Sequence, residues 1–325
     1  MQSYQIGSNQ AGQRLDKFLN KFMPDAGNGF LYKMLRKKNI VLNGKKAEGK
    51  EILAVGDTVS FFFSDETFLK FTARKSENSN HEVSGYEHAY KQLKGIRVLY
   101  EDEDILILDK PAGILTQRAQ AGQDSLNEWM IGYLLAEKKI TSETLTTFKP
   151  SVQNRLDRNT SGLVLCGISL RGSQLLSRLI HDRSLRKYYV TIVKGKIASG
   201  VELTGTLKKD DKKNFVTMDT KEGIPVKTVI RPLSYGNDTT LLEVELVTGK
   251  THQIRAHLAS IGHPVLGDAK YGDRTFNARF QGRIPEYQLL HAVRVEFPVL
   301  TKPFERLSQK VFKAPVPSVF EEGMK

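Results

Sequence analysis

Beyond residue 96 the chain consists mainly of short apolar or alternating stretches that predict β-strands, with helical periodicity only between some of them. The clearest strand signals cover residues 105–108, 163–166, 188–193, 228–232 and 241–246. A doubly wound fold needs strands and helices in regular alternation, and this order of elements does not show it. We therefore expect an α+β fold, in which a mixed, largely antiparallel central sheet carries flanking helices.

The overall charge points to a polyanionic partner. Lys and Arg number 49 against 36 Asp and Glu, for a net charge of +13, which leaves RNA, DNA and anionic lipid open as partners. The single cysteine, Cys166, excludes an internal disulfide framework and a Cys-based zinc site. No run approaches the roughly 20 apolar residues of a membrane span, and the N-terminus lacks a signal pattern. We expect a cytoplasmic protein with no membrane partner.

Residues 11–63 predict a compact, basic α/β module. Two short helices, at residues 14–22 and 28–37, precede strands that Asn43-Gly44 joins, and Asn-Gly is the strongest short-range hairpin signal. The polar side of the second helix carries four cations, Lys33, Arg36, Lys37 and Lys38. Cations beside an exposed hairpin suit a phosphate backbone, although an ordinary solvated face is the competing interpretation.

The next segment is polar and has no sustained periodicity, which predicts a linker at residues 65–94, with a short strand at residues 65–71. A chain of 325 residues has room for two domains. We therefore divide it into a front module (residues 1–64), this linker, and a large domain (residues 95–325).

The first candidate site in the large domain is Asp157. It stands between Arg155 and Arg158, in a polar stretch directly before a buried strand, so its carboxylate is expected on a loop at the sheet edge. Neighbouring guanidinium groups favour an ionised carboxylate, which can act as a nucleophile or a base. The tripeptide Arg-Leu-Asp recurs at the start of the first helix, where Asp16 is simply a favourable first-turn residue. A loop salt bridge is thus the competing interpretation of Asp157.

Two further stretches of the large domain carry candidate residues. On the strand that begins near Lys187, side chains alternate, so Tyr188 and Tyr189 face opposite sides and only one can line a given cleft. For either tyrosine, a core position with a bonded hydroxyl is the competing interpretation. A helix at residues 251–260 places Arg255 away from its apolar side. Its two histidines are five residues apart, unlike the i, i+4 pair of a zinc-binding helix, so we expect no metal.

Taken together, these stretches carry a family resemblance. "LYEDEDILILDKPAGIL", "NRLDRNTSGLVL", "RSLRKYYVTIVKG", "TGKTHQIRAHLASIGHPVLGDAKYG" and "LLHAVRVEFP", in this order, resemble the RluA/RluC/RluD family of pseudouridine synthases over about residues 96–300, and the layout is closest to the RluC-like branch. In the front module, "GQRLDKFL", "LYKMLRKKNIVLNGKKA" and "VGDTVSFFF" resemble the small RNA-binding domain first described in ribosomal protein S-four, which many members carry.

The resemblance implies roles for individual residues. Asp157 aligns with the catalytic aspartate, Tyr189 with the active-site tyrosine, and Arg255 with the arginine that pairs with the catalytic carboxylate. Arg155 aligns with an arginine that helps to flip the target base. RNA contacts are also expected from Arg158, Lys187, Lys33, Arg36, Lys37 and Lys38. Two positions depart from the common pattern, Asn154 in place of His and Thr191 in place of Ala.

The resemblance also implies the reaction, which is the isomerisation of uridine to pseudouridine in RNA by a monomer, without cofactor or metal. Large-subunit ribosomal RNA is the expected substrate, with transfer RNA as an alternative. A non-catalytic RNA-binding protein on the same fold is the alternative from a different functional class.

Overall fold

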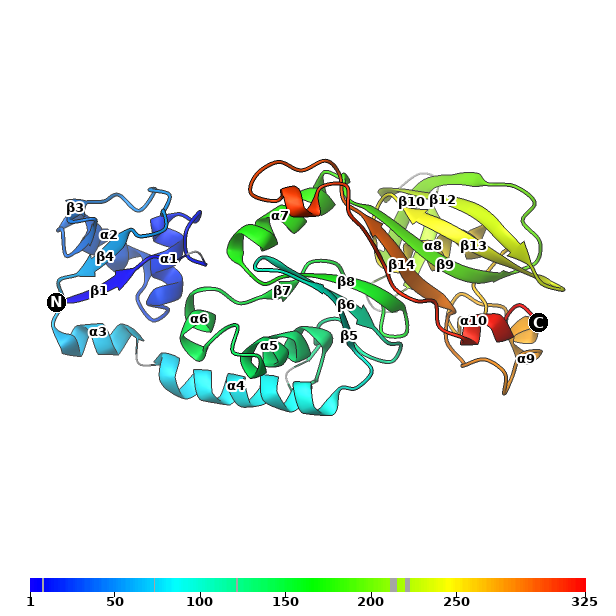
Figure 1. The fold of residues 1–325 in the computed structure, drawn as a ribbon, viewed down its shortest axis with the longest axis horizontal. Helices are drawn as coiled ribbons and strands as arrows, with labels where there is room; N and C mark the ends of the chain where they lie inside the picture. The colour runs from blue at the N-terminus through cyan, green and yellow to red at the C-terminus, as the bar shows by residue number, and fades with distance from the viewer. Residues whose placement is uncertain (8, 73, 121, 211–214, 220–222) are drawn as a thin grey trace.

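The chain folds into two parts joined by helices in a computed structural model (Figure 1), which describes residues 1–7, 9–72, 74–120, 122–210, 215–219 and 223–325. The strands are β1 (Gln2–Gln5), β2 (Ile40–Leu42), β3 (Lys45–Lys46), β4 (Thr58–Phe61), β5 (Arg97–Glu101), β6 (Ile105–Lys110), β7 (Ser151–Val152), β8 (Ser161–Gly167), β9 (Arg186–Lys194), β10 (Val201–Asp210), β11 (Phe215–Asp219), β12 (Ile224–Tyr235), β13 (Thr239–Leu246), β14 (Leu290–Glu296) and β15 (Val311–Lys313). The helices are α1 (Leu15–Phe22), α2 (Asn28–Arg36), α3 (Asp65–Thr72), α4 (Arg74–Gln92), α5 (Leu126–Ala136), α6 (Ser142–Thr147), α7 (Leu170–His181), α8 (Gln253–Ser260), α9 (Arg274–Ala278) and α10 (Val319–Glu322), with a 3₁₀ turn at Glu305–Leu307.

The large domain is built on one mixed sheet. Its strand order is β11-β10-β12-β13-β9-β14-β8-β6-β5, with β7 paired to β8 and β15 paired to β14. The described pairs are antiparallel except β14 with β8, which run parallel. Helices flank this sheet: α7 packs on β8, and α8 packs against β11 and β12 (Figure 1). The predicted α+β class with a mixed, largely antiparallel sheet is confirmed.

The strands at the centre of the sheet are buried, which fixes the loops between them. All residues of β6 and β8 are buried, and so are seven of the nine residues of β9, from Lys187 to Val193. Side chains from these strands form the main core with Leu126 and Met130 of α5 and Leu176 of α7. Burial of this apolar surface stabilises the sheet, so the loop between β7 and β8 starts and ends on rigid backbone.

The front module has a hydrophobic core of its own, made by residues between Ile6 and Phe61. Its four strands are ordered β1-β4-β2-β3, and the predicted Asn43-Gly44 hairpin joins β2 to β3. Both turn residues have positive φ, 50° and 71°, as a two-residue hairpin turn of the primed type requires.

The segment predicted as a linker is helical on both sides of residue 73, which lies outside the described residues. The predicted strand at residues 65–71 is wrong, because α3 occupies this stretch. Ser64 accepts a hydrogen bond from the backbone N–H of Thr67 (3.2 Å), as an N-terminal cap does. Phe68 and Phe71 then fall on one face of the helix and pack against the front core, with the ring centroids of Phe71 and Phe30 4.5 Å apart.

Helix α4 leads from the front module to the large domain and packs along α5 (Figure 1). Tyr86 and Ala89, one helical turn apart, are its buried residues among those described. The two helices approach closely at Gly132, where a Cβ atom would lie 2.2 Å from the Tyr86 carbonyl oxygen. The sequence predicted a linker here because α4 is polar on average. The two buried residues, Tyr86 and Ala89, form too narrow an apolar face to show as a periodic pattern.

The front module also contacts the large domain directly. Gln10 Nε2 donates to Thr147 Oγ1 at the end of α6 (2.7 Å), and both residues are buried. Helices α1 and α6 lie against each other around this bond. The orientation of the front module is thus fixed by a buried polar contact as well as by α4.

Candidate active site

Asp157 lies on the loop between β7 and β8, and the side chains of Lys110 and Thr116 hold that loop. Lys110 Nζ donates to the carbonyl oxygens of Pro111, Ile114 and Arg158, at 2.9–3.0 Å. Thr116 Oγ1 donates to the Leu156 carbonyl (2.7 Å) and accepts from the Leu156 N–H (3.1 Å). Burial lowers the pKa of Lys110 to about 7, against the opposing charges of Asp157 and Asp109. The buried Lys110 side chain therefore connects the loop after β6 to the Asp157 loop through hydrogen bonds.

The two departures from the family pattern also have structural partners. Asn154 donates to the Leu163 carbonyl (3.2 Å) and accepts from the Leu165 N–H (2.7 Å), so its amide continues the pairing of β7 with β8. Thr191 donates to the Leu289 carbonyl (2.7 Å). Both side chains satisfy backbone groups of neighbouring segments, which is a supporting role.

Gly162, the second residue of β8, follows the Asp157 loop and leaves no space for a side chain. Its φ is +107°, and a Cβ atom would lie 2.3 Å from the Ala292 carbonyl oxygen on β14. This close approach occurs at the parallel pairing of β8 with β14. The loop can therefore enter the sheet next to β14 only because residue 162 is glycine.

Arg255 on α8 joins two carboxylates. Its Nη1 donates to Asp157 Oδ2 (2.7 Å), while Nε and Nη2 donate to Asp268 Oδ2 (2.7 Å) and Oδ1 (2.9 Å). The side chain of Asp268 has no exposed surface, and that of Asp157 is 24% exposed. Burial raises the pKa of Asp268, but its hydrogen bonds and ion pair with Arg255 outweigh this, so its pKa is lowered. Arg255 is therefore anchored on its inner side and presents one N–H to the more open carboxylate.

Tyr189 occupies β9, between Val244 on β13 and Ala292 on β14. It is 6% exposed, and burial, with a smaller effect from the charge of Asp157, raises its pKa. The phenol is consequently protonated at neutral pH and lies within electrostatic range of the Asp157 carboxylate. Tyr188, on the opposite side of the strand, instead has the guanidinium of Arg294 3.9 Å from its ring centroid.

A second chain of contacts reaches Asp157 from the start of α8. His252 Nε2 lies 3.8 Å from Asp157 Oδ2, and His252 Nδ1 lies 3.0 Å from the hydroxyl oxygen of Tyr271. The same hydroxyl oxygen accepts from the backbone N–H of Val216 in β11 (2.9 Å). The guanidinium carbon of Arg255 stands 5.1 Å from the Tyr271 ring centroid. His252, Arg255 and Tyr271 therefore form one wall around the carboxylate.

The arginines next to Asp157 in the sequence do not pair with it. Arg155 is exposed, and Arg158 donates its Nε to the Gly113 carbonyl (3.1 Å). Neither makes an ion pair with Asp157, whose expected cationic partner is Arg255 instead. Among the described residues, the ion pair of Asp157 with an arginine is therefore made by Arg255 and not by its neighbours in the sequence.

The other predicted RNA-binding residues lie in different places. Lys187 is buried, with burial lowering its pKa, and its Nζ stands 3.7 Å from the position that a Gly249 Cβ would take, beside the turn before α8. Lys33 and Arg36 on α2, and Lys37 and Lys38 directly after it, are exposed on the front module. That module lies at the far end of the molecule from α8 (Figure 1).

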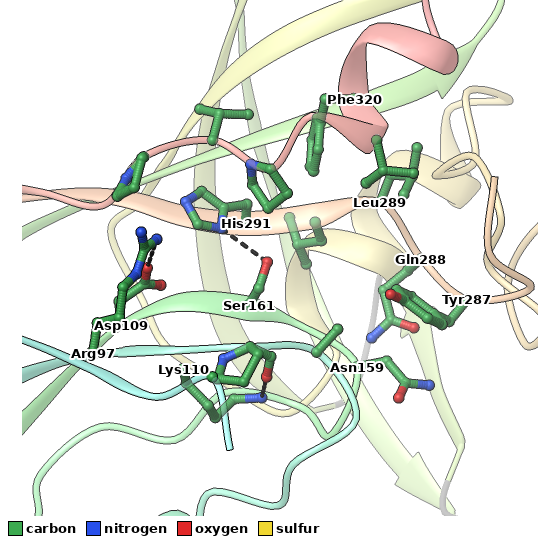
Figure 2. A pocket seen from close by; sticks show the side chains of 18 residues that line it. Arg97, Asp109, Lys110, Asn159, Ser161, Tyr287, Gln288, Leu289, His291 and Phe320 are labelled. Carbon is green, nitrogen blue, oxygen red and sulfur yellow. Dashed lines mark hydrogen bonds and ion pairs between the residues drawn. The ribbon is translucent and has the colours of Figure 1, made fainter. Parts of the chain in front are cut away.

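A cavity of about 400 Å³ lies beside the base of the Asp157 loop (Figure 2). Lys110, Asn159 and Ser161 line it, and Ser161 Oγ is 2.8 Å from His291 Nδ1. Asp157 is not among its lining residues. The cavity therefore backs the loop and is separate from the carboxylate.

Sequence patterns did not identify three residues of this site as functional. Asp268 and Tyr271 lie within the motif that carries the family resemblance without a predicted role of their own, and His252 was weighed only against the spacing of a zinc-binding helix. The sequence signal for this position is an Asp directly after a glycine, Gly267-Asp268. Among the described residues, no three His, Cys, Asp or Glu side chains gather as a metal ion would require.

Comparison with known proteins identifies the family to which this arrangement belongs. The family model described as RNA pseudouridylate synthase matches residues 104–260. An uncharacterized RNA pseudouridine synthase of Mycoplasma pneumoniae is 30% identical over 316 residues, which are 93% of this chain and 91% of that protein. The chain belongs to the RNA pseudouridine synthase family. It is therefore an isomerase that acts on RNA, and the resemblance predicted from its ordered motifs is confirmed.

Other relatives support the RluC-like branch and the fold. Ribosomal large subunit pseudouridine synthase C of Vibrio parahaemolyticus is 28% identical over 309 residues, covering 91% of this chain and 88% of that protein. Human RNA pseudouridylate synthase domain containing 4 has the same fold, with a TM-score of 0.55 and 19% identity over 74% of this chain and 95% of that one. Within the described residues, no helix combines the length and the apolarity of a membrane span.

Proposed function

We propose that Asp157 starts the isomerisation of a uridine in large-subunit ribosomal RNA. The observation that carries this assignment is Arg255, which bridges Asp157 to the buried Asp268. A guanidinium fixed on one side by a bidentate pair holds the second carboxylate in one orientation through a charge-assisted hydrogen bond. An oriented, partly exposed carboxylate at a sheet edge is what the first step of the reaction needs.

The reaction is an isomerisation, so its atoms balance within one nucleotide. The bond from uracil N1 to ribose C1′ breaks, a bond from uracil C5 to C1′ forms, the C5 proton leaves, and N1 gains a proton. Asp157 starts the sequence either by attack on the sugar or by removal of a proton, and both routes use the ionised form. No oxidant, reductant or second substrate enters this balance.

Tyr189 and Arg155 take different parts in this proposal. Tyr189, whose pKa burial raises, offers its ring as a stacking surface and its protonated hydroxyl to the uracil, where a tyrosine can also take part in general acid–base work. Arg155 is exposed next to the carboxylate in the loop, where it is free to enter the RNA stack as the target base leaves it. Lys187 is buried beside the turn at Gly249, where burial and the charge of Arg183 lower its pKa, so direct contact of its ammonium group with RNA is not part of this proposal.

The substrate assignment rests on the relatives. Ribosomal large subunit pseudouridine synthase C is the name of similar proteins in Vibrio and Salmonella, at 28% identity. We expect that cells which lack this gene lose pseudouridine at one or more positions of large-subunit ribosomal RNA and regain it when the gene is restored. Pseudouridine mapping of total RNA tests this. Loss confined to transfer RNA would reject the ribosomal substrate, and an unchanged map would favour a non-catalytic RNA-binding protein.

The basic helix of the front module is proposed to contact phosphates. A variant in which Lys33, Arg36, Lys37 and Lys38 are all replaced by Gln is expected to bind structured RNA more weakly. The slope of log affinity against log salt should shrink by about 0.7–0.9 for each cation that contacts a phosphate. The measurement is RNA binding at several salt concentrations.

The control for this variant removes equal charge elsewhere. A second variant replaces four exposed lysines of the large domain by Gln, namely Lys138, Lys302, Lys310 and Lys313. Equal slopes for the two variants would show that only overall charge matters and would reject the specific role of the helix.

A further inference from the structure

Helix α7 carries a polar stripe on the side that faces away from the core. Leu175, Leu176 and Leu179 are buried and form its inner side. Four exposed residues at the helical spacing i, i+3, i+4 and i+7 form the outer side: Gln174, Ser177, Arg178 and His181. A solvated amphipathic helix has the same pattern, so the pattern alone does not indicate a function.

The stripe lines an open cavity of about 520 Å³ on the surface of the large domain. The lining consists of two amides, two hydroxyls, a guanidinium and an imidazole, with no carboxylate among them: Gln153, Ser173, Gln174, Ser177, Arg178 and His181. Arginine, serine and glutamine side chains are the groups that proteins use to contact the phosphates and sugars of a nucleic acid. The chemistry of this groove therefore fits a sugar–phosphate backbone.

The groove also lies between the two parts of the molecule that are proposed to contact RNA. Helix α7 stands between the front module and the strands of the large sheet (Figure 1). A Cβ atom on Gly12 of the front module would lie 3.9 Å from Gln174 Oε1. Gln153 comes four residues before Asp157, so its Cα atom is at most about 14 Å from that of Asp157. One RNA strand in the groove would thus run from the front module towards the Asp157 loop.

The competing interpretation is that the cations only stabilise the helix. Arg178 and His181 are in the last turn, where positive charge is favourable beside the helix dipole. However, α7 has no acidic residue, and in the part of the chain that the structure describes neither cation makes an ion pair. Asp182, next in the sequence, accepts instead from the backbone N–H (3.0 Å) and the hydroxyl (2.6 Å) of Ser184. The charge of Arg178 is therefore available to a ligand.

The chemistry of the stripe favours RNA over a protein as its partner. The centre of a protein–protein interface is enriched in aromatic and other apolar side chains. The exposed stripe of α7 has none, since all four of its residues are polar. The chain also belongs to a family that acts on RNA.

We propose that the outer side of α7, with Arg178 at its centre, binds the RNA backbone between the front module and the Asp157 loop. This inference rests on the proposed RNA contacts of those two parts and adds the surface that connects them. Gln174 and Ser177 contribute neutral hydrogen bonds to the same strand, and Arg178 contributes the charge-assisted one.

The experiment measures the affinity of the full-length protein for a transcript of large-subunit ribosomal RNA at several salt concentrations. In Arg178→Gln the slope of log affinity against log salt is expected to shrink by about 0.7–0.9, the value for one phosphate contact. The ratio of affinities between about 50 and about 200 mM salt should then fall about threefold. The single-turnover rate at saturating RNA is expected to stay at the wild-type value, because the groove does not touch the reacting atoms.

Three further variants separate the groove from general effects of charge and of folding. Arg178→Lys keeps the cation and is expected to keep the salt slope. Arg231→Gln removes an equal exposed charge from β12, in the part of the large domain far from the front module, and is expected to keep the slope as well (Figure 1). Ser177→Glu places a negative charge in the groove and should weaken RNA binding more than Ser234→Glu, an exposed position on β12. Unfolding followed by the fluorescence of Trp129, the single tryptophan, checks that all variants fold alike.

A wild-type salt slope for Arg178→Gln overturns the proposal. Equal reductions in Arg178→Gln and Arg231→Gln also overturn it, because they would show that only overall charge matters. An equal reduction in Arg178→Lys with lower stability would assign the loss to the helix and not to a phosphate contact. Failure of the proposed function gives a different result: wild-type protein would leave the transcript unmodified, while the salt slopes would still test the groove.

Discussion

An Asp157→Asn protein is expected to bind RNA with wild-type affinity and to form no detectable pseudouridine. Asn has the shape of Asp and its oxygen still accepts a hydrogen bond from Arg255, which now contacts Asp157 Oδ2 at 2.7 Å. It lacks the negative charge that either attack or proton removal needs. The single-turnover rate should fall by at least about 10⁴-fold, the upper end of what proton transfer by one side chain contributes.

The chain supplies a matched control for this experiment. The tripeptide Arg-Leu-Asp occurs a second time, at the start of α1, where Asp16 pairs with Arg14 (2.6 Å) and accepts from the Tyr32 hydroxyl (2.8 Å). Asp16→Asn removes the same charge from the same local sequence, and it is expected to keep the rate of isomerisation. Pseudouridine formation by Asp157→Asn at a rate near that of Asp16→Asn would refute the assignment of Asp157.

The two copies of the tripeptide show what local sequence determines and what it does not. The first copy opens an amphipathic helix, and the second precedes the buried strand β8, and both contexts were predicted from the hydrophobic pattern alone. Alternation and apolar runs likewise predicted β6, β9, β12 and β13, because each strand is either buried throughout or exposed on one face. The fold class follows from such patterns.

The partners of Asp157 could not be predicted in the same way. Arg155 and Arg158 are its neighbours in sequence, yet the arginine that pairs with it is 98 residues away, on a helix packed against other strands. Asp268 and His252 also belong to the group around Asp157. Asp268 follows the glycine at residue 267, and His252 has a left-handed backbone conformation. Only the family resemblance indicated Arg255, since periodicity places a side chain on a face but does not say what lies opposite.

Helices α3 and α4 illustrate a second limit. A short strand was predicted at residues 65–71, whereas Phe68 and Phe71 are spaced for one face of a helix that Ser64 caps. In α4 the polar composition concealed the short buried stripe that packs on α5. In both helices tertiary packing, and not local preference, decides the structure.

Replacing Arg255 is expected to have the largest combined effect on stability and activity. In Arg255→Met, Asp268 keeps the backbone N–H donors of Lys270 (2.8 Å) and Tyr271 (3.0 Å) but loses its counter-ion in a position without solvent exposure. An uncompensated buried charge lowers the free energy of unfolding by about 3–5 kcal/mol. Unfolding in urea, followed by Trp129 fluorescence in α5, measures this for the large domain, and pseudouridine formation should be lost as well.

A second substitution divides the two effects. In the double variant Arg255→Met/Asp268→Asn the buried charge is removed with its partner, while the Asn oxygen still accepts from both N–H groups. Most of the lost stability should return, because the penalty arises from the unpaired carboxylate. Activity should not return, because Asp157 still lacks the guanidinium that orients it. Recovery of both properties would mean that Arg255 acts only on the fold, and recovery of neither would mean that the guanidinium is needed for packing and not for the charge of Asp268.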